Sequence, residues 1–276
     1  MKLVLEGGGV RAAYASGVIH SLSRAGVVPD AVIGSSSGAL NAAFTAAGQI
    51  DVAIEMWRTV IPGNRMVNWR RQFTPWGKPG LDVDWIVDEA LSDRLDLDRA
   101  TSGRTHLYFT ATDIDARRAV VARPTRDNLL TWLRAALALP VGYNRIVEVE
   151  GRRFIDGGIG SPVPFDEPLA EEYPGPTVVI LTRPMQTKKP PPALWERVAL
   201  KLIVPPGARE LSETQHEHHN ALMGRLAGAV ARGEVILVEP PPDLPLSRLT
   251  QSAEKIQRGV ELGQRVGERL ARELGA

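Results

Sequence analysis

The sequence predicts an α/β fold in which helices cover a parallel sheet. A short apolar run at residues 2–5 leads into three glycines and then into a helical pattern over residues 10–26. A second apolar run, "DAVIG" at 30–34, leads into another turn and an alanine-rich helical stretch at 37–48. Strand, turn and helix repeated in this order are typical of βαβ units, whose strands lie parallel.

Later segments supply further elements of the same sheet and its covering helices. Apolar, β-branched stretches predict strands at residues 106–114, 118–123, 146–156, 177–183 and 234–240. Glu150-Gly151 predicts a hairpin turn within the third of these strands. Helical periodicity predicts helices at residues 51–60, 84–91, 127–138, 209–232 and 247–273. No repeat or low-complexity segment divides the chain, so we expect one domain over residues 1–276.

Two segments fit this core poorly. Residues 61–83 contain two Trp and three Arg residues but little periodicity, which is consistent with a lid over a site or with a plain surface excursion. Residues 193–204 are apolar and follow Lys188 and Lys189. They form either a helix that covers the sheet or a segment that touches a membrane interface.

The composition excludes several classes of function. The chain of 276 residues has 33 Lys and Arg residues against 32 Asp and Glu residues, so its net charge of +1 gives no argument for nucleic acid as a partner. Cysteine is absent, which excludes disulfides, thiol nucleophiles and cysteine-ligated metals. No stretch reads as a secretory signal or a membrane span. We therefore expect a cytoplasmic location.

The segment "VIGSSSGALNAAF", residues 32–44, contains the pattern G-x-S-x-G. In this pattern the central serine sits on a strained turn between a strand and a helix. Side chains at Gly34 and Gly38 would collide with the adjoining elements, and the following helix points its N-terminus at the site. Ser36 is therefore a candidate nucleophile. The alternative is a turn of small residues that only packs two elements closely.

A second glycine loop lies at "EGGGVRAA", residues 6–13. Glycines expose backbone N–H groups, so Gly7, Gly8 and Gly9 can receive the negative charge on an attacked carbonyl oxygen. The loop also fits a dinucleotide-binding pattern loosely, with Ala12 in the third glycine position. Such sites need an acidic residue at the end of the second strand, where this sequence has its serines. We expect no nucleotide cofactor.

Asp156 is the preferred base for Ser36. It ends a predicted strand and precedes Gly157 and Gly158, which allow close backbone approach. A buried carboxylate beside a serine hydroxyl is desolvated in its charged form, which raises its basicity. The alternative is an aspartate that only begins a glycine turn.

Other titratable residues offer further alternatives. Asp113 and Asp115 are rival acids, for which we prefer a role in supporting a loop. The histidines of the chain are His20, His106, His216, His218 and His219. A triad of Ser36, Asp156 and one of the three late histidines stays open. The late cluster holds only one copy of an E-x-x-H spacing, so we expect no metal site.

Three segments together resemble the patatin-like phospholipase family. They are "LVLEGGGVRAAYASGVIHSL", "VIGSSSGALNAAF" and "RFIDGGIGSPVPFDEPL", in the family's order and at its spacing. The similarity is clear over residues 2–48 and 145–169 and weaker over 106–143. Each piece alone is common, whereas their combination is specific.

The resemblance implies a three-layer α/β/α sandwich with a mainly parallel central sheet. It also implies a Ser-Asp dyad without histidine, in which Ser36 attacks a fatty-acyl lipid ester, Asp156 accepts the proton and an acyl-enzyme forms. No metal or cofactor would be needed, and contact with a membrane surface would be transient. Arg11 would hold the glycine loop. The residues that would frame the oxyanion hole and support the elbow and the aspartate loop are Gly7, Gly8, Gly9, Gly34, Gly38, Gly157 and Gly158.

The sequence departs from the family pattern in two places. Ala12 stands where the family usually has a glycine after Arg11, and Gly160 and Ser161 stand where asparagines are frequent. Two alternative functions also remain at this stage. One is a histidine-dependent α/β-hydrolase esterase, and the other is a catalytically silent member that binds lipid.

Overall fold

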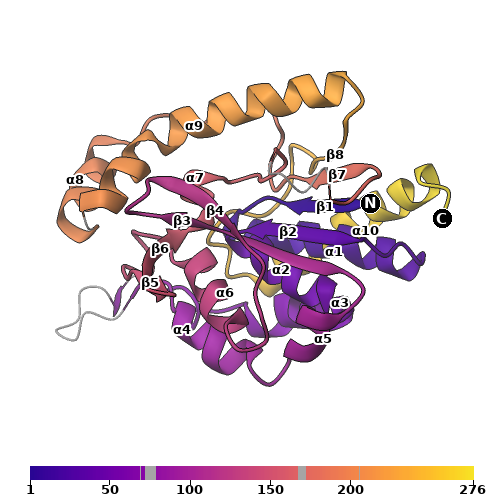
Figure 1. Cartoon of the computed structure of the whole chain (residues 1–276), viewed down its shortest axis with the longest axis horizontal. Helices are drawn as coiled ribbons and strands as arrows, with labels where there is room; N and C mark the ends of the chain where they lie inside the picture. Colours follow the sequence, from indigo (N-terminus) through magenta and orange to yellow (C-terminus); the bar gives the residue numbers. More distant parts are fainter. Residues whose placement is uncertain (69, 72–78, 167–171, 205) are drawn as a thin grey trace.

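A computed structural model describes residues 1–68, 70–71, 79–166, 172–204 and 206–276. Within these residues one mixed sheet of eight strands has the order β5-β6-β3-β2-β1-β7-β8, with β4 paired to β3 (Figure 1). The strands are β1 (Lys2–Leu5), β2 (Ala31–Ser35), β3 (His106–Asp113), β4 (Arg118–Ala122), β5 (Val147–Val149), β6 (Arg152–Asp156), β7 (Thr177–Ile180) and β8 (Val235–Val238). The pairs that join β3, β2, β1, β7 and β8 are parallel, whereas β4, β5 and β6 pair antiparallel.

Helices cover both faces of the sheet (Figure 1). One layer contains α1 (Ala12–Arg24), α2 (Ser37–Ala46), α3 (Ile50–Glu55), α4 (Val83–Trp85), α5 (Leu97–Ser102), α6 (Leu129–Leu137) and α10 (Ala253–Glu273). The other contains α7 (Gly157–Gly160), α8 (Leu194–Ile203) and α9 (Pro206–Ala231). Along β1, Leu3 and Leu5 belong to the core under the first layer, while Val4 belongs to the core under α9. This alternation is the period of a strand buried on both faces, and it confirms the three-layer α/β/α architecture.

The helices α1 and α10 pack with their backbones close together. A Cβ at Gly17 of α1 would lie 2.1 Å from the carbonyl oxygen of Val260, and one at Gly263 of α10 would lie 2.0 Å from that of Tyr14. Only glycine fits at such distances. Because the glycine loop leads into α1 and residues 247–252 lead into α10, this packing fixes the two loops relative to each other.

The prediction of a helix from residue 247 is wrong at its start, because α10 begins at Ala253. The N–H of Ser247 donates to the Thr250 hydroxyl at 2.8 Å, a local side-chain bond that competes with helical hydrogen bonding. Ser252 then caps the helix by accepting the N–H of Lys255 at 3.3 Å. Residues 247–252 consequently form a loop.

The other expected elements are present, apart from shifts at their ends. Each strand expected from the sequence occurs, and the hairpin turns at Glu150 and Gly151 with φ of 52° and 74°. The helix α3 continues to Val60 and α4 continues to Leu91 as π-helical turns. The short helices α5 and α7 were not predicted, since neither six nor four residues carry a readable period.

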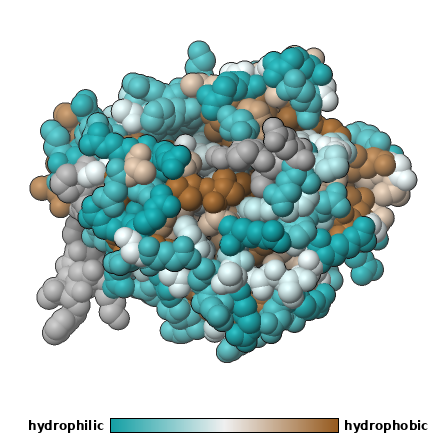
Figure 2. All heavy atoms as spheres, in the orientation of Figure 1, coloured by the Kyte–Doolittle hydropathy of each residue, from teal (hydrophilic) through white to brown (hydrophobic). Residues whose placement is uncertain are grey.

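Within residues 193–204 the chain forms the helix α8 (Leu194–Ile203), and this segment has one buried and one exposed side. Leu200 and Val204 pack into a small core. Leu194, Val198 and Leu202 are exposed, and Figure 2 shows apolar atoms at the edge of the molecule where α8 lies. Among the described residues, no helix combines the length and the apolar character needed to cross a bilayer.

Candidate active site

Ser36 occupies the turn between β2 and α2 and has an unusual backbone conformation. Its φ of 51° and ψ of −129° lie in a region that side chains rarely adopt. A Cβ at Gly34 would lie 2.3 Å from the carbonyl oxygen of Gly38, and one at Gly38 would lie 2.5 Å from that of Leu5. Gly34 therefore lets β2 and α2 approach closely, and Gly38 lets α2 approach β1, so that Ser36 is held on a sharp elbow.

Asp156 ends β6 and is buried, with 2% of its surface exposed. Its Oδ2 accepts the Ser36 hydroxyl at 2.7 Å, and its Oδ1 accepts the N–H of Gly158 at 2.7 Å. A Cβ at Gly157 would lie 2.1 Å from the carbonyl oxygen of Thr110. In the Asp-Gly-Gly sequence, Gly158 thus provides a hydrogen-bond donor for the carboxylate, and Gly157 allows the backbone to pack closely against β3.

The sheet brings these two residues together. Ser35, the last residue of β2, pairs with Thr110, and Asp156, the last residue of β6, pairs with Ala111. Since β4 pairs with β3 over Phe109–Asp113, it overlaps both partners and occupies the opposite edge. The strands β2 and β6 therefore follow each other along one edge of β3 and end at neighbouring residues.

The environment of Asp156 makes it a stronger base than an ordinary carboxylate. Burial raises the pKa of Asp156 to about 6, against the hydrogen bonds from Ser36 and Gly158 and the charges of Arg248 and Lys189, which lower it. A carboxylate with this pKa is ionised at neutral pH and accepts a proton more readily than an exposed one.

The glycine loop lies directly against Ser36. A Cβ at Gly7 would lie 2.7 Å from the Cβ of Ser36, and one at Gly8 would lie 2.3 Å from the hydroxyl of Thr182. Gly9 has a φ of 60°, which glycine adopts without strain. The N–H of Gly8 donates to the Ser37 hydroxyl at 3.0 Å in this structure. The loop thus lies beside Ser36, and its expected role in an oxyanion hole stays a prediction.

Arg11 lies behind this loop. Its Nε and Nη2 are buried and have no hydrogen-bond acceptor among the described residues. Its expected role in holding the glycine loop therefore stays a prediction.

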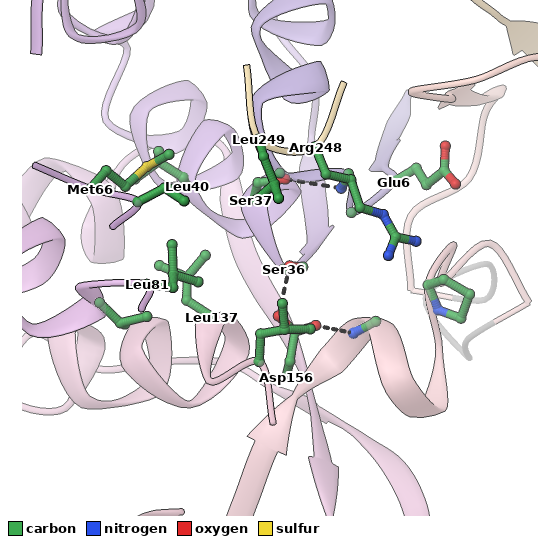
Figure 3. A pocket seen from close by; sticks show the side chains of 18 of the residues that line it. Glu6, Ser36, Ser37, Leu40, Met66, Leu81, Leu137, Asp156, Arg248 and Leu249 are labelled. Carbon is green, nitrogen blue, oxygen red and sulfur yellow. Dashed lines mark hydrogen bonds between the residues drawn. The ribbon is translucent and has the colours of Figure 1, made fainter. Parts of the chain in front are cut away.

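A pocket of about 340 Å³ opens at Ser36 and Asp156. Figure 3 shows apolar side chains on one side of Ser36 and the charged groups of Arg248 and Glu6 on the other. The apolar wall consists of Leu40, Trp57, Ile61, Met66, Val67, Leu81, Val83, Ile86, Leu137, Leu139 and Val141. An activated hydroxyl beside an apolar cavity is suited to an ester of a long acyl chain.

Comparison with known proteins assigns the fold and the site to one family. The family model of patatin-like phospholipases matches residues 3–169. The chain belongs to this family. The match includes the glycine loop, the serine elbow and the Asp-Gly-Gly segment, and membership supports lipid acyl hydrolase activity for this patatin-like chain.

Two similar proteins extend this finding. Uncharacterized protein YjjU of Escherichia coli K12 is 34% identical over 194 residues, which cover 67% of this chain and 52% of that protein. The patatin-like chain thus spans about half the length of that relative. The crystal structure of VipD from Legionella pneumophila matches with a TM-score of 0.52 and 14% identity, covering 99% of this chain and 66% of that one. At this identity the likeness concerns the fold alone.

The rival acids lie in other interactions. Asp113 Oδ1 accepts the N–H groups of Asp115 and Ala116, both at 2.8 Å, and its other oxygen pairs with Arg152. Asp115 pairs with Arg153. Both aspartates therefore stabilise the β3–β4 turn, in agreement with the loop-supporting role that we preferred.

Among the histidines, His219 lines the pocket. Arg183 lies 2.9 Å from its Nε2. Burial, reinforced by the charges of Arg183 and Lys189, lowers the pKa of His219 to about 3. His20 pairs with Asp51, and in the described part of the chain no three His, Asp or Glu side chains gather as metal ligands.

Several pocket residues were not predicted from the sequence. They are Glu6, Arg183, Lys189, Gln215, Arg248 and Leu249. Arg183 follows β7 at the end of the sheet where α/β folds place their sites, so its position was a usable signal. Arg248 and Leu249 lie in the segment predicted as helix, which concealed them.

The expected lid, residues 61–83, is described in part. Met66, Val67 and Leu81 line the pocket, and Val67 forms an isolated bridge with Leu81. Residues 69 and 72–78 of this segment lie outside the described part of the chain. The lid function stays a prediction.

Proposed function

We propose that this patatin-like chain is a serine lipid acyl hydrolase in which Ser36 is the nucleophile and Asp156 the general base. The observation that carries the proposal is the 2.7 Å hydrogen bond from the Ser36 hydroxyl to Asp156 Oδ2, at the mouth of an apolar pocket. In this arrangement the hydroxyl already points its proton at the acceptor, which is the geometry that general-base catalysis requires.

The reaction follows two steps. Asp156 takes the proton of Ser36 as Oγ bonds to the ester carbonyl carbon, and it gives that proton to the leaving alkoxide oxygen when the C–O bond breaks. An acyl-enzyme and a free alcohol result. A water molecule then gives its proton to Asp156 and attacks the acyl carbon, Ser36 recovers its proton from Asp156, and the fatty acid leaves.

The oxyanion of each tetrahedral intermediate requires donors. The glycine loop and the amide of Ser37, the first residue of α2, border the nucleophile. Within the loop, the N–H of Gly7 donates to the carbonyl oxygen of Pro162 at 3.2 Å. Donors at a helix N-terminus and in a glycine loop favour negative charge there, and one such donor is typically worth about 3 kcal/mol in the transition state. The Gly8 amide can serve only after it exchanges its bond to the Ser37 hydroxyl for one to substrate.

The proposal includes contact with a lipid surface through α8. Leu194, Val198 and Leu202 recur every four residues on its exposed side, with 78%, 49% and 80% of their surfaces accessible. Arg197 and Lys201 are exposed on the same helix. An apolar stripe with adjacent basic side chains is suited to an anionic membrane interface. The double variant Leu194→Gln/Leu202→Gln should bind anionic vesicles more weakly than wild type and hydrolyse a dispersed short ester equally well. Equal vesicle binding by the variant and wild type would exclude α8 as the contact surface.

An ester chain-length series on wild type, Ser36→Ala and Asp156→Asn tests the proposal, together with an active-site fluorophosphonate probe. We expect the probe to label wild type and not Ser36→Ala, and both variants to lose hydrolysis. Labelling of Ser36→Ala would contradict the assignment of Ser36 as the nucleophile. His219→Gln removes the histidine that lines the pocket and should retain hydrolysis of a short neutral ester, with His216→Gln and His218→Gln as controls. Loss of activity in His219→Gln would favour a histidine base.

A further inference from the structure

The polar wall of the pocket carries an excess of positive charge. Arg183, Lys189 and Arg248 line it, and Glu6 and Asp156 are the acidic residues among the described lining residues. Among the described residues that line the pocket, three cationic side chains therefore stand beside two acidic ones, Glu6 and Asp156. Figure 3 shows Arg248 and Glu6 on the side of Ser36 opposite Leu40, Met66, Leu81 and Leu137. Arg183 lies beside Glu6.

Arg183 is held in place, and its charge is only partly offset. Its Nε lies 3.5 Å from Glu6 Oε1, and its guanidinium contacts the His219 ring at 2.9 Å. Glu6 Oε2 already accepts the hydroxyl of Thr182 at 2.9 Å as well as its N–H. Because the pKa of His219 is lowered to about 3, chiefly by burial, the ring is neutral and accepts this contact without adding charge.

Lys189 is fixed by α9 and connected to the aspartate loop. Its backbone N–H donates to Asn220 at 2.9 Å, and the Asn220 amide donates back to its carbonyl oxygen at 3.0 Å. Its ammonium group donates to Gln215, which in turn donates to the carbonyl oxygen of Gly158. The cation is therefore built into the same framework as Asp156.

Arg248 comes from the loop before α10. Its carbonyl oxygen accepts the N–H of Val10 at 3.1 Å, which fixes the loop beside the glycine loop. Figure 3 shows its side chain extending into the pocket between Ser36 and Glu6. Unlike Arg183, Arg248 is exposed, so its side chain is accessible to an incoming ligand.

Arg248 repels the guanidinium groups of Arg11 and Arg183 in the folded protein. Burial, followed by the charge of Arg248, lowers the pKa of Arg11 to about 10, with Arg183 acting in the same direction. Burial lowers the pKa of Arg183, and Arg248 lowers it further against the opposing effect of Glu6. A cluster of like charges at a pocket wall costs stability, and an anionic ligand offsets that cost.

We propose that Arg183, Lys189 and Arg248 form a subsite for a phosphate group, so that the preferred substrates are acyl esters whose head group is a net negative glycerol phosphate. The proposal rests on the proposed function for the acyl-transfer step, and it adds a binding subsite for the head group of the substrate. Guanidinium and ammonium groups form charge-assisted hydrogen bonds with phosphate oxygens. The acyl chain then occupies the apolar wall, and the scissile ester lies between the two at Ser36.

Hydrolysis of three substrates with one acyl chain tests the subsite. They are monoacylglycerol phosphate, monoacylglycerol phosphocholine and monoacylglycerol, each kept below its critical micelle concentration. The assays are run at about pH 8.5, where Asp156 is ionised with and without Arg248. We expect wild type to have the highest kcat/KM on the phosphate, and Arg248→Gln to lower that value about tenfold while changing the monoacylglycerol value less than twofold. Arg272→Gln, an exposed residue of α10, is the charge-matched control. Equal wild-type values, or an equal loss on all three substrates, would overturn the proposal.

Calorimetry with ether analogues decides the subsite independently of catalysis. Alkylglycerol phosphate should bind wild type at least about tenfold more tightly than alkylglycerol, and Arg248→Gln should remove most of the difference. No difference would refute the subsite even if esters are hydrolysed. If instead no ester is hydrolysed and Ser36 is not labelled, the proposed function fails while this comparison still decides the subsite. Inorganic phosphate that binds as tightly as the analogue would show a free-phosphate site and refute the head-group assignment.

Discussion

The Ser36 hydroxyl and the Asp156 carboxylate lie 2.7 Å apart although 120 positions separate them in the chain. Their contact follows from strand register, because β2 and β6 end opposite Thr110 and Ala111 on the same edge of β3. The relative position of these two groups is therefore set by the sheet and not by a flexible connection. Sites held on strands keep their geometry more closely than sites held on loops.

Substitution of Ser36 separates its chemistry from its backbone strain. Ser36→Ala and Ser36→Gly should both lower kcat/KM by at least about 10³-fold, because each lacks the hydroxyl that we propose as the nucleophile. Since φ is 51° and ψ is −129°, the glycine variant should be more stable than the alanine variant by about 1 kcal/mol. Urea unfolding measures the difference. Equal stability of the two variants would show that the elbow stores no strain.

The pH dependence of kcat/KM should report the ionisation of Asp156. Burial raises its pKa to about 6, and the base must be ionised to accept a proton, so the rate should fall as pH decreases through about 6. Arg248 and Lys189 stabilise the carboxylate, so Arg248→Gln should move the acidic limb to higher pH. Arg272→Gln serves again as the control. A limb near pH 4 in wild type would contradict the burial argument.

Asp156→Asn should lower activity and raise stability. The folded-state pKa of about 6 exceeds the ordinary value of 3.8, so ionisation of this group opposes folding above pH 6, and the effect disappears below about pH 4. The variant should exceed wild type in unfolding free energy by on the order of 1–3 kcal/mol at pH 8, and the difference should shrink at pH 4.5. Denaturant unfolding at both pH values checks this. A variant less stable at pH 8 would mean that the carboxylate's hydrogen bonds outweigh its desolvation.

Much of the fold, and the position of Ser36 on a strand-to-helix turn, could be predicted because their signals are local. Gly34, Ser36 and Gly38 are close in sequence, and the βαβ rhythm appears in adjacent segments. The prediction of Asp156 depended on a further signal, namely its position at the end of a predicted strand and before two glycines. Its contact with Ser36 depends on an antiparallel strand that continues the edge left by β2, which no local pattern contains.

The cationic residues in the polar wall of the pocket could not be predicted, for a different reason. Arg183, Lys189 and Arg248 come from three separate segments, and each is ordinary in its own sequence context. The periodicity after residue 247 extended the predicted helix over Arg248, whereas the Ser247–Thr250 hydrogen bond turns that segment into a loop. Hydrogen bonds of this kind prevent a helix from forming, although the apolar residues of the sequence still recur at helical spacing.

The elbow glycines should tolerate no side chain. Gly34→Ala places a Cβ 2.3 Å from the backbone oxygen of Gly38, which cannot move without displacing α2. We expect a loss of several kcal/mol in stability or failure to fold. Gly224→Ala is the matched control, because a Cβ there meets nothing within 4 Å and alanine favours its helix, α9. Thermal unfolding compares the two variants. Equal stability of both would contradict the close approach of β2 and α2.

A larger side chain in the apolar wall should shift the preference to shorter acyl chains without affecting the selection between head groups. Leu81 lines that wall, and its backbone N–H is fixed by the carbonyl oxygen of Gly142 at 3.0 Å, so Leu81→Trp should fill part of the cavity. We expect reduced kcat/KM on long-chain esters and an unchanged value on short ones. Because Leu81 and Arg248 lie on opposite sides of Ser36, the effects of Leu81→Trp and Arg248→Gln should be additive in the double variant. Coupling above about 0.5 kcal/mol would show that chain and head group share one region, contrary to the proposed orientation.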